Sequence, residues 1–102
     1  MKRIEEFNPT GGIIVSLGLD THAGDPCTLR RAGFELSGTD YFEMGQMIGQ
    51  YAAAVANNNT NNDDYDSNSN SPPVVFIQEG GYYMEKVPKA VKDVLVGFAE
   101  QH

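Results

Sequence analysis

The sequence is poor in cysteine and in long apolar runs, and each shortage excludes a class of protein. Cys27 is the only cysteine among 102 residues, so no disulfide can form within the chain and a reducing compartment is favoured. No run of about 18 apolar residues occurs, so no membrane span is predicted. The first six residues hold two basic side chains but no apolar stretch, unlike a secretory signal. We therefore expect a cytoplasmic or nuclear protein that is not bound to a membrane.

Basic residues are also scarce. Seven Lys and Arg against fourteen Asp and Glu give a formal net charge of −7. A nucleic-acid-binding domain normally carries a basic patch, so direct nucleic-acid binding is not expected. An acidic surface can attract cationic substrates over long range. However, Asp63, Asp64 and Asp66 lie in a low-complexity segment, and the charge is interpreted mainly as an aid to solubility.

Two short runs of β-branched and aromatic residues end at glycine and then present a reactive side chain. Residues 13–17 are followed by a glycine, a leucine and Asp20, and residues 74–79 by two glycines and Tyr82. A helical pattern between the runs predicts that they are parallel strands in an α/β sheet. Ligands bind beyond the carboxyl ends of such strands. We therefore expect Asp20 and Tyr82 at the same edge, facing one site.

Helical periodicity occupies three segments around these strands. Ile4 and Phe7 are spaced as on the last turns of an amphipathic helix, which a proline and two glycines then end. Ser37 and Asp40 have the spacing of a capping box for a second helix. Pro88 lies near the first turn of a third helix, where proline is favoured. Apolar residues mark one face of each long helix: Tyr41, Met44, Ile48, Tyr51 and Val55 in the second, and Val87, Val91, Val94, Leu95 and Phe98 in the third.

The organisation of the chain indicates part of a larger domain. Uninterrupted apolar strands belong to parallel sheets covered on both faces, and two helices cannot cover both faces. Residues 57–71 form a polar, asparagine-rich segment for which we expect a disordered surface insert. We predict that residues 1–102 are one partial α/β domain that contains this insert.

Each candidate site residue also has a structural interpretation. The carboxylate of Asp20 could reach a metal or a substrate, or it could cap the following loop. Tyr82 could donate a hydrogen bond to a developing oxyanion, or it could be an aromatic anchor, and Tyr83 is an equal candidate. Asp20 and His22 form an Asp-x-His pair, which alone is a weak metal signal. Asp25, which precedes a proline, is assigned to a turn.

Taken together, the two strand-end motifs resemble the zinc-dependent deacetylase superfamily, which contains the histone deacetylases and the acetylpolyamine amidohydrolases. The motifs are Val15-Ser16-Leu17-Gly18-Leu19-Asp20-Thr21-His22-Ala23-Gly24-Asp25-Pro26 and Gln78-Glu79-Gly80-Gly81-Tyr82. Residues 37–45 between them look closer to the acetylpolyamine branch. The resemblance runs from about Ile4 to Phe98 apart from the insert. It implies the C-terminal part of a three-layer α/β/α parallel-sheet domain of the arginase/deacetylase type.

The resemblance also implies a function and site residues. It implies a metal-dependent amide hydrolase that removes acetyl groups from an acetylpolyamine or from acetyl-lysine. By position, Asp20 matches a metal-binding aspartate, and Tyr82 matches the tyrosine that polarises the acetyl carbonyl. Gly80 lies on the turn that borders the substrate channel, while His22 inherits no role. The implied cofactor is zinc, and the implied partners are an acetylated amine and the remainder of the deacetylase domain.

The chain departs from the family in what it lacks. His22 and His102 are its only histidines. Since Asp20 matches the family's later metal-binding aspartate, the histidine pair and the Asp-x-His metal motif that lie N-terminal in relatives are missing. A catalytic zinc needs about three protein ligands, of which only Asp20 is recognised. We therefore expect a C-terminal portion that is inactive alone. The alternative is a non-catalytic degenerate paralogue, or a small α/β protein that binds a partner through its apolar sheet.

Overall fold

A computed structural model describes residues 2–9, 11–26, 35–59 and 71–101. The elements, in chain order, are helix α1 (Lys2–Phe7), strand β1 (Ile13–Gly18), the short 3₁₀ turn η1 (Leu19–Thr21), helix α3 (Gly38–Asn59), strand β2 (Val74–Glu79) and helix α4 (Val87–Ala99). This order agrees with the order that the sequence pattern predicts, and the α/β class is confirmed. None of the described helices is long and apolar enough to cross a membrane.

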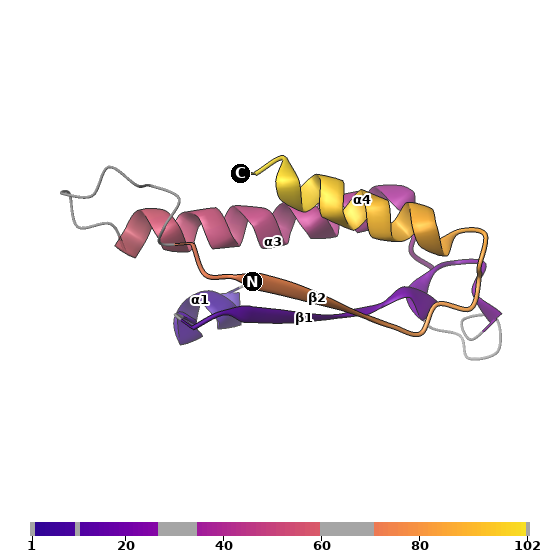
Figure 1. Ribbon diagram of the computed structural model, residues 1–102, viewed down its shortest axis with the longest axis horizontal. Coiled ribbons are helices and arrows are strands. Elements are labelled where there is room, and N and C mark those ends of the chain that lie inside the picture. Colours follow the sequence, from indigo (N-terminus) through magenta and orange to yellow (C-terminus); the bar gives the residue numbers. More distant parts are fainter. Residues whose placement is uncertain (1, 10, 27–34, 60–70, 102) are drawn as a thin grey trace.

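Strands β1 and β2 pair directly and in parallel. The register aligns Ile13 with Val74 at one end and Gly18 with Glu79 at the other. Because both strands run in the same direction, the residues that follow Gly18 and Glu79 leave the sheet at the same edge. Figure 1 shows the two strands side by side, with α3 and α4 lying over them. The edge at which the sequence places its candidate residues is therefore present.

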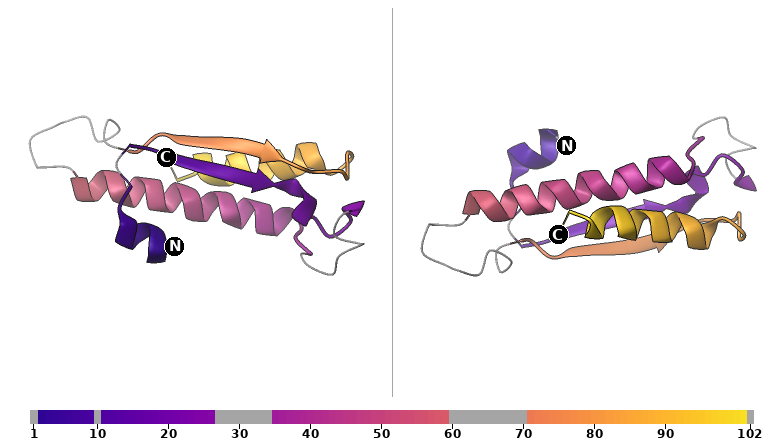
Figure 2. Two further views of the ribbon diagram at one scale, coloured as in Figure 1. Left: turned by 90° about the horizontal axis from the view of Figure 1, so that it is seen from below. Right: turned by 90° about the horizontal axis from the view of Figure 1, so that it is seen from above.

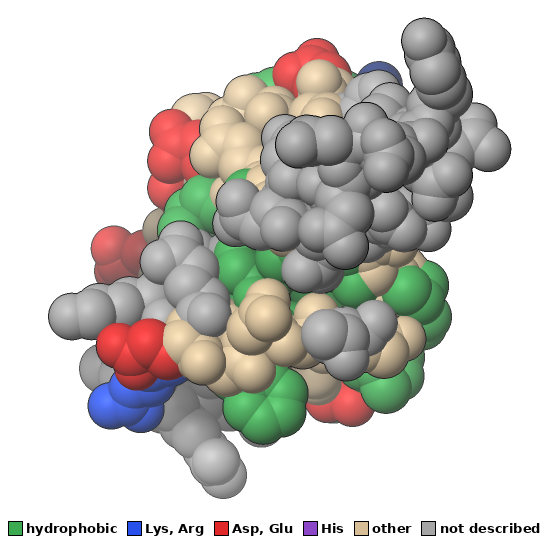
Figure 3. Space-filling view, turned by 90° about the vertical axis from the view of Figure 1, so that its left-hand side faces the viewer, with side chains coloured by type: hydrophobic (Ala, Val, Ile, Leu, Met, Phe, Trp, Pro, Cys, Tyr) green, Lys and Arg blue, Asp and Glu red, His purple; other side chains and the backbone are tan. Residues whose placement is uncertain are grey.

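The two long helices cover only one face of the sheet (Figure 2). On that face Leu17 is buried and Phe76 is half-buried. On the other face Ile14 is 72% exposed, Val75 53% and Ile77 45%. At one end of the molecule, too, hydrophobic side chains lie at the surface beside acidic ones (Figure 3). The described residues thus form one sheet layer and one helical layer, and the third layer stays a prediction.

The core lies between the sheet and the pair of helices α3 and α4. The two helices approach each other closely. The buried residues of the core are Leu17, Leu19, Tyr41, Ala90 and Val94. Glycines bring the two helices together. A Cβ on Gly45 of α3 would overlap the carbonyl oxygen of Val94, and one on Gly97 of α4 would overlap that of Phe42. Backbone therefore packs on backbone where α3 and α4 cross.

A local sequence signal accounts for the start of α3. Tertiary packing determines which residues of α4 are buried. The Ser37 N–H donates to Asp40 Oδ2 at 2.8 Å, as the capping-box spacing predicts. Leu95, expected on the apolar face of α4, is instead 44% exposed. The buried stripe runs through the small residues Ala90 and Gly97, because these let α3 approach most closely.

Helix α3 continues to Asn59, three residues into the segment that was expected to be a loop from residue 57. Residues 60–70 of the predicted insert lie outside the described residues. The expectation of disorder over 57–71 therefore stays a prediction for residues 60–70, whereas residues 57–59 are helical.

The helix crossing generates a stability prediction. Alanine favours a helix over glycine by about 1 kcal/mol, but in Gly97→Ala its methyl group would enter the backbone of α3. We expect a net destabilisation of about 1–3 kcal/mol, the usual effect of overpacking. The denaturant midpoint measures it. Gly11→Ala is the control, since a Cβ there meets nothing within 4 Å. Equal midpoints for the two variants would contradict the close crossing.

Candidate functional site

The carboxyl end of β1 leads into the η1 turn, which carries Asp20. Leu19 is 1% exposed and anchors this turn in the core. The Thr21 hydroxyl donates to the carbonyl oxygen of Gly18 at 2.8 Å, which closes the turn. Thr21 Oγ1 also lies 2.9 Å from the hydroxyl oxygen of the buried Tyr41. Because the threonine's one hydrogen is already used, the Tyr41 hydroxyl is the donor in this second bond.

The carboxyl end of β2 forms a glycine turn that packs on η1. Gly80 and Gly81 have φ angles of 65° and 94°, a region that residues with side chains rarely adopt. A Cβ on Gly80 would lie 3.1 Å from Cγ of Asp20, and one on Gly81 would lie 3.0 Å from Cβ of Leu19. The two strand-end turns therefore lie against each other. The predicted site residues Asp20 and Gly80 are brought together.

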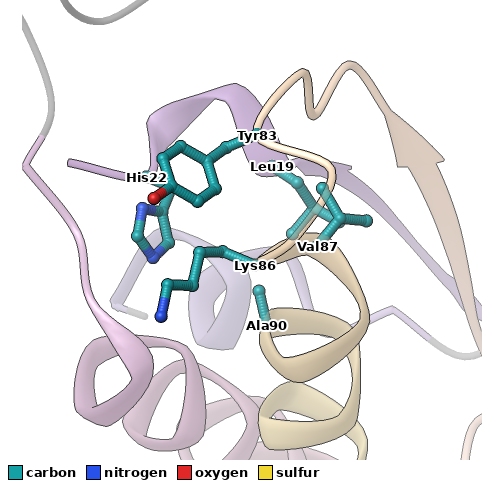
Figure 4. A pocket seen from close by; sticks show the side chains of 6 residues that line it. All are labelled: Leu19, His22, Tyr83, Lys86, Val87 and Ala90. Carbon is teal, nitrogen blue, oxygen red and sulfur yellow. The ribbon is translucent and has the colours of Figure 1, made fainter. Parts of the chain in front are cut away.

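The two tyrosines after the glycine turn have different surroundings. Tyr82 is 57% exposed. Tyr83 is half-buried, and its ring stacks on His22 with 5.6 Å between ring centroids. Figure 4 shows the Tyr83 ring above the His22 imidazole, with Lys86 alongside. Tyr83 is thus the aromatic anchor of the turn, while the side chain of Tyr82 reaches solvent. The sequence had left these two tyrosines as equal candidates.

His22 is a packed residue. Its ring also stacks on Tyr41, with 6.1 Å between centroids and 11° between ring planes. Its Nδ1 accepts the N–H of Gly24 at 3.2 Å. The imidazole therefore links α3 to the loop that follows β2. The expectation that His22 inherits no role in the site stays a prediction.

Asp25 holds the backbone of both tyrosines. Its side chain is 0% exposed, and Oδ2 accepts the N–H of Tyr82 at 2.7 Å and that of Tyr83 at 3.2 Å. The N–H of Asp25 donates to the His22 carbonyl at 3.0 Å, so the predicted turn is also present. The sequence missed the contact with the tyrosines. A charged side chain is seldom fully buried unless it has a partner. The Gly-Asp-Pro motif does not indicate which segment of the chain provides that partner.

A catalytic zinc takes about three protein ligands and keeps one position open. Across residues 2–9, 11–26, 35–59 and 71–101, no group of three or more His, Cys, Asp or Glu side chains is placed to hold a metal. The described residues therefore do not fit a complete zinc site. Cys27 lies outside the described residues.

The surroundings of Tyr41 raise the pKa of its phenol above the ordinary value of 10.0. Burial is the largest cause, because it disfavours the phenolate. The negative charges of Asp25, Asp20 and Asp40 raise the pKa further. The neutral phenol, which donates to Thr21, is therefore the form that the fold favours.

This shift predicts a pH dependence of stability. A raised folded-state pKa contributes stability that is complete below the unfolded pKa and is lost as pH rises through the folded pKa. Above about pH 10, we expect the free energy of unfolding to fall more steeply in the wild type than in Tyr41→Phe. At neutral pH the variant should be about 1 kcal/mol less stable, because it lacks one hydrogen bond. Denaturant titrations at several pH values measure both effects, and parallel pH profiles would contradict the assignment.

Comparison with known proteins gives a match along most of the chain. Over 90 residues the chain is 32% identical to acetylpolyamine amidohydrolase 2 of Pseudomonas aeruginosa. The match covers 88% of this chain and 20% of that protein, so the chain spans about a fifth of the relative's length. No family model matches the chain. No solved structure matches it.

Proposed function

We propose that this chain, whose resemblance to the deacetylase superfamily is supported by both motifs and by its relative, is the C-terminal part of an amide hydrolase. The reaction would remove acetyl groups from acetylated amines, either an acetylpolyamine or acetyl-lysine. Asp20 would be a metal ligand, Gly80 would border the substrate channel, and Tyr82 would be the catalytic phenol. These roles come from the motif positions.

The contact between the two strand-end turns is the observation that carries the proposal. The carboxyl group of Asp20 lies against Gly80, and the exposed Tyr82 follows two residues later. A carboxylate and a phenol thus leave the sheet at one edge, where ligands of parallel sheets bind. Hydrolysis of an amide passes through a tetrahedral intermediate that carries an oxyanion. A phenol fixed at such an edge can donate a hydrogen bond to that oxygen.

One divalent metal, taken to be zinc, belongs to the proposal. When bound, such a metal polarises the amide carbonyl and activates water. Asp20 is the one residue of the described part that we assign to it. The other ligands and the histidines that move protons would lie outside this chain, in the remainder of the domain. This chain's own contribution would be one carboxylate and one oriented phenol.

The exposed apolar face of the sheet is an argument for a further segment that covers it in the proposed domain. Ile14, Val75 and Ile77 project from the face opposite the helices. In an α/β/α domain a further helical layer would cover them. The same face favours the second candidate function, a non-catalytic protein that binds a partner through its sheet. Asp-x-His and His-His motifs in the preceding coding sequence would favour the enzyme, and a stop codon there would favour the second candidate.

The catalytic assignment is tested with Tyr82→Phe in the whole protein. A donor that acts on the oxyanion works mainly in the transition state, so its loss should lower kcat more than it changes KM. We expect a decrease in kcat on the order of 100-fold to 1000-fold, as for other oxyanion donors. Metal content and folding should stay near wild type, because the ring remains.

Tyr83→Phe is the matched control. It removes the adjacent hydroxyl but leaves the ring that stacks on His22, so its effect on kcat should be small. Full turnover in Tyr82→Phe, or a larger loss in Tyr83→Phe, would show that the catalytic phenol is wrongly assigned.

The ligand count generates a further prediction for the chain by itself. Since the described residues hold no group that could complete a metal site, purified residues 1–102 should bind zinc weakly and show no turnover. Acetylated polyamines and acetyl-lysine peptides are the substrates to assay. Zinc-dependent turnover that disappears in Asp20→Ala would overturn the proposal that ligands lie elsewhere.

A further inference from the structure

We propose that Asp25 is a positioning residue for Tyr82. This inference rests on the proposed function and deepens it, because it names the group that aims the phenol. Asp25 is fully buried, so it cannot touch a substrate at the surface. It acts instead through the main chain of Tyr82, the residue that would contact the substrate.

The glycine turn creates the need for such a residue. Gly80 and Gly81 both adopt positive φ angles, and consecutive glycines leave a backbone many conformations of similar energy. The direction in which Tyr82 leaves the turn is therefore not set by the turn's own sequence. It must be set by contacts with the residues that follow the glycines.

The carboxylate of Asp25 provides these contacts at the first residue after the turn. One oxygen, Oδ2, accepts the N–H groups of Tyr82 and Tyr83 at 2.7 and 3.2 Å. Hydrogen bonds to an ionised acceptor are roughly twice as strong as neutral ones. Two successive amides on one oxygen also fix the rotation of the peptide plane between them. The Cα–Cβ direction of Tyr82 follows from that plane.

The segment around Asp25 is itself held by contacts with Tyr83 and with Leu36. A Cβ on Gly24 would lie 2.7 Å from Cε2 of Tyr83, which shows how closely that ring covers the loop. The N–H of Ala23 donates to the carbonyl of Leu36 at 2.9 Å. The same loop continues directly from η1, which carries Asp20. The short segment from η1 to Asp25 thus carries the carboxylate of Asp20 and also orients the phenol of Tyr82.

The test is a double-mutant cycle in the whole protein that contains this chain. Asp25→Asn keeps the shape and one acceptor oxygen but removes the charge, and Asp25→Ala removes both acceptors. We expect Asp25→Asn to lower kcat by on the order of 10-fold to 100-fold with little change in KM, because a misplaced donor loses mainly transition-state contacts. Asp25→Ala should lose more. In a Tyr82→Phe background, Asp25→Asn should cause almost no further loss.

Asp93→Asn is the matched control. It makes the same chemical change in a carboxylate of α4 that pairs with Lys89 at 2.6 Å, and it should leave kcat unchanged. Amide hydrogen exchange at Tyr82 and Tyr83 gives a second measurement that needs no activity. Both amides should exchange faster in Asp25→Asn, while the amides of α3 stay protected.

The outcomes separate this inference from the proposed function. Additive losses in the double variant, or unchanged exchange at both tyrosine amides, would overturn the positioning role while Tyr82 kept its own. Full turnover in Tyr82→Phe would overturn the proposed function and, with it, any catalytic effect through Tyr82. Faster exchange together with a loss of kcat that depends on the Tyr82 hydroxyl supports the inference.

Discussion

The parallel pairing of β1 with β2 is the constraint on which the rest of the structure depends. Its register sets Gly18 opposite Glu79, so the turns after both strands begin at the same level of the same edge. A parallel pair needs a long crossover, which α3 provides, and α4 then packs on the same side. This pairing brings the turns that carry Asp20 and Gly80 against each other.

Side chains from other elements then fix each turn. The η1 turn is held by the hydroxyl of Tyr41, which reaches Thr21 from α3. The glycine turn is held by the carboxylate of Asp25, which reaches it from the loop after η1. His22 stacks between Tyr41 and Tyr83 and so connects the two supports. In each case a buried polar group is satisfied by a segment distant in the sequence, which makes both turns depend on the assembled core.

The sequence predicts what is local and misses what is tertiary. β-branched runs, glycines and the Ser37–Asp40 spacing carry local conformational preferences, and the strands, turns and helix start agree with them. Leu95 is wrongly assigned because helical periodicity does not say that α3 packs most closely over Ala90, Val94 and Gly97, which leaves Leu95 at the margin of the packed face. The sequence also could not distinguish Tyr82 from Tyr83, and it did not reveal the contact that Asp25 makes with them. Their difference lies in a carboxylate and an imidazole contributed from another strand's loop.

The exposed face of the sheet and the candidate site are formed by the same two strands. The segment that covers this face in the proposed domain therefore bears on both folding and function. Ile14, Val75 and Ile77 lie on β1 and β2, whose ends carry Asp20 and Tyr82. A segment that buries those three side chains would run along both strands, from the Ile14–Val75 pair to Ile77. Burial of apolar surface is the main driving force for such docking, at roughly 25 cal/mol per Å². In the proposed domain, the segment that covers the sheet would therefore lie on the same two strands that present Asp20 and Tyr82 at their carboxyl ends.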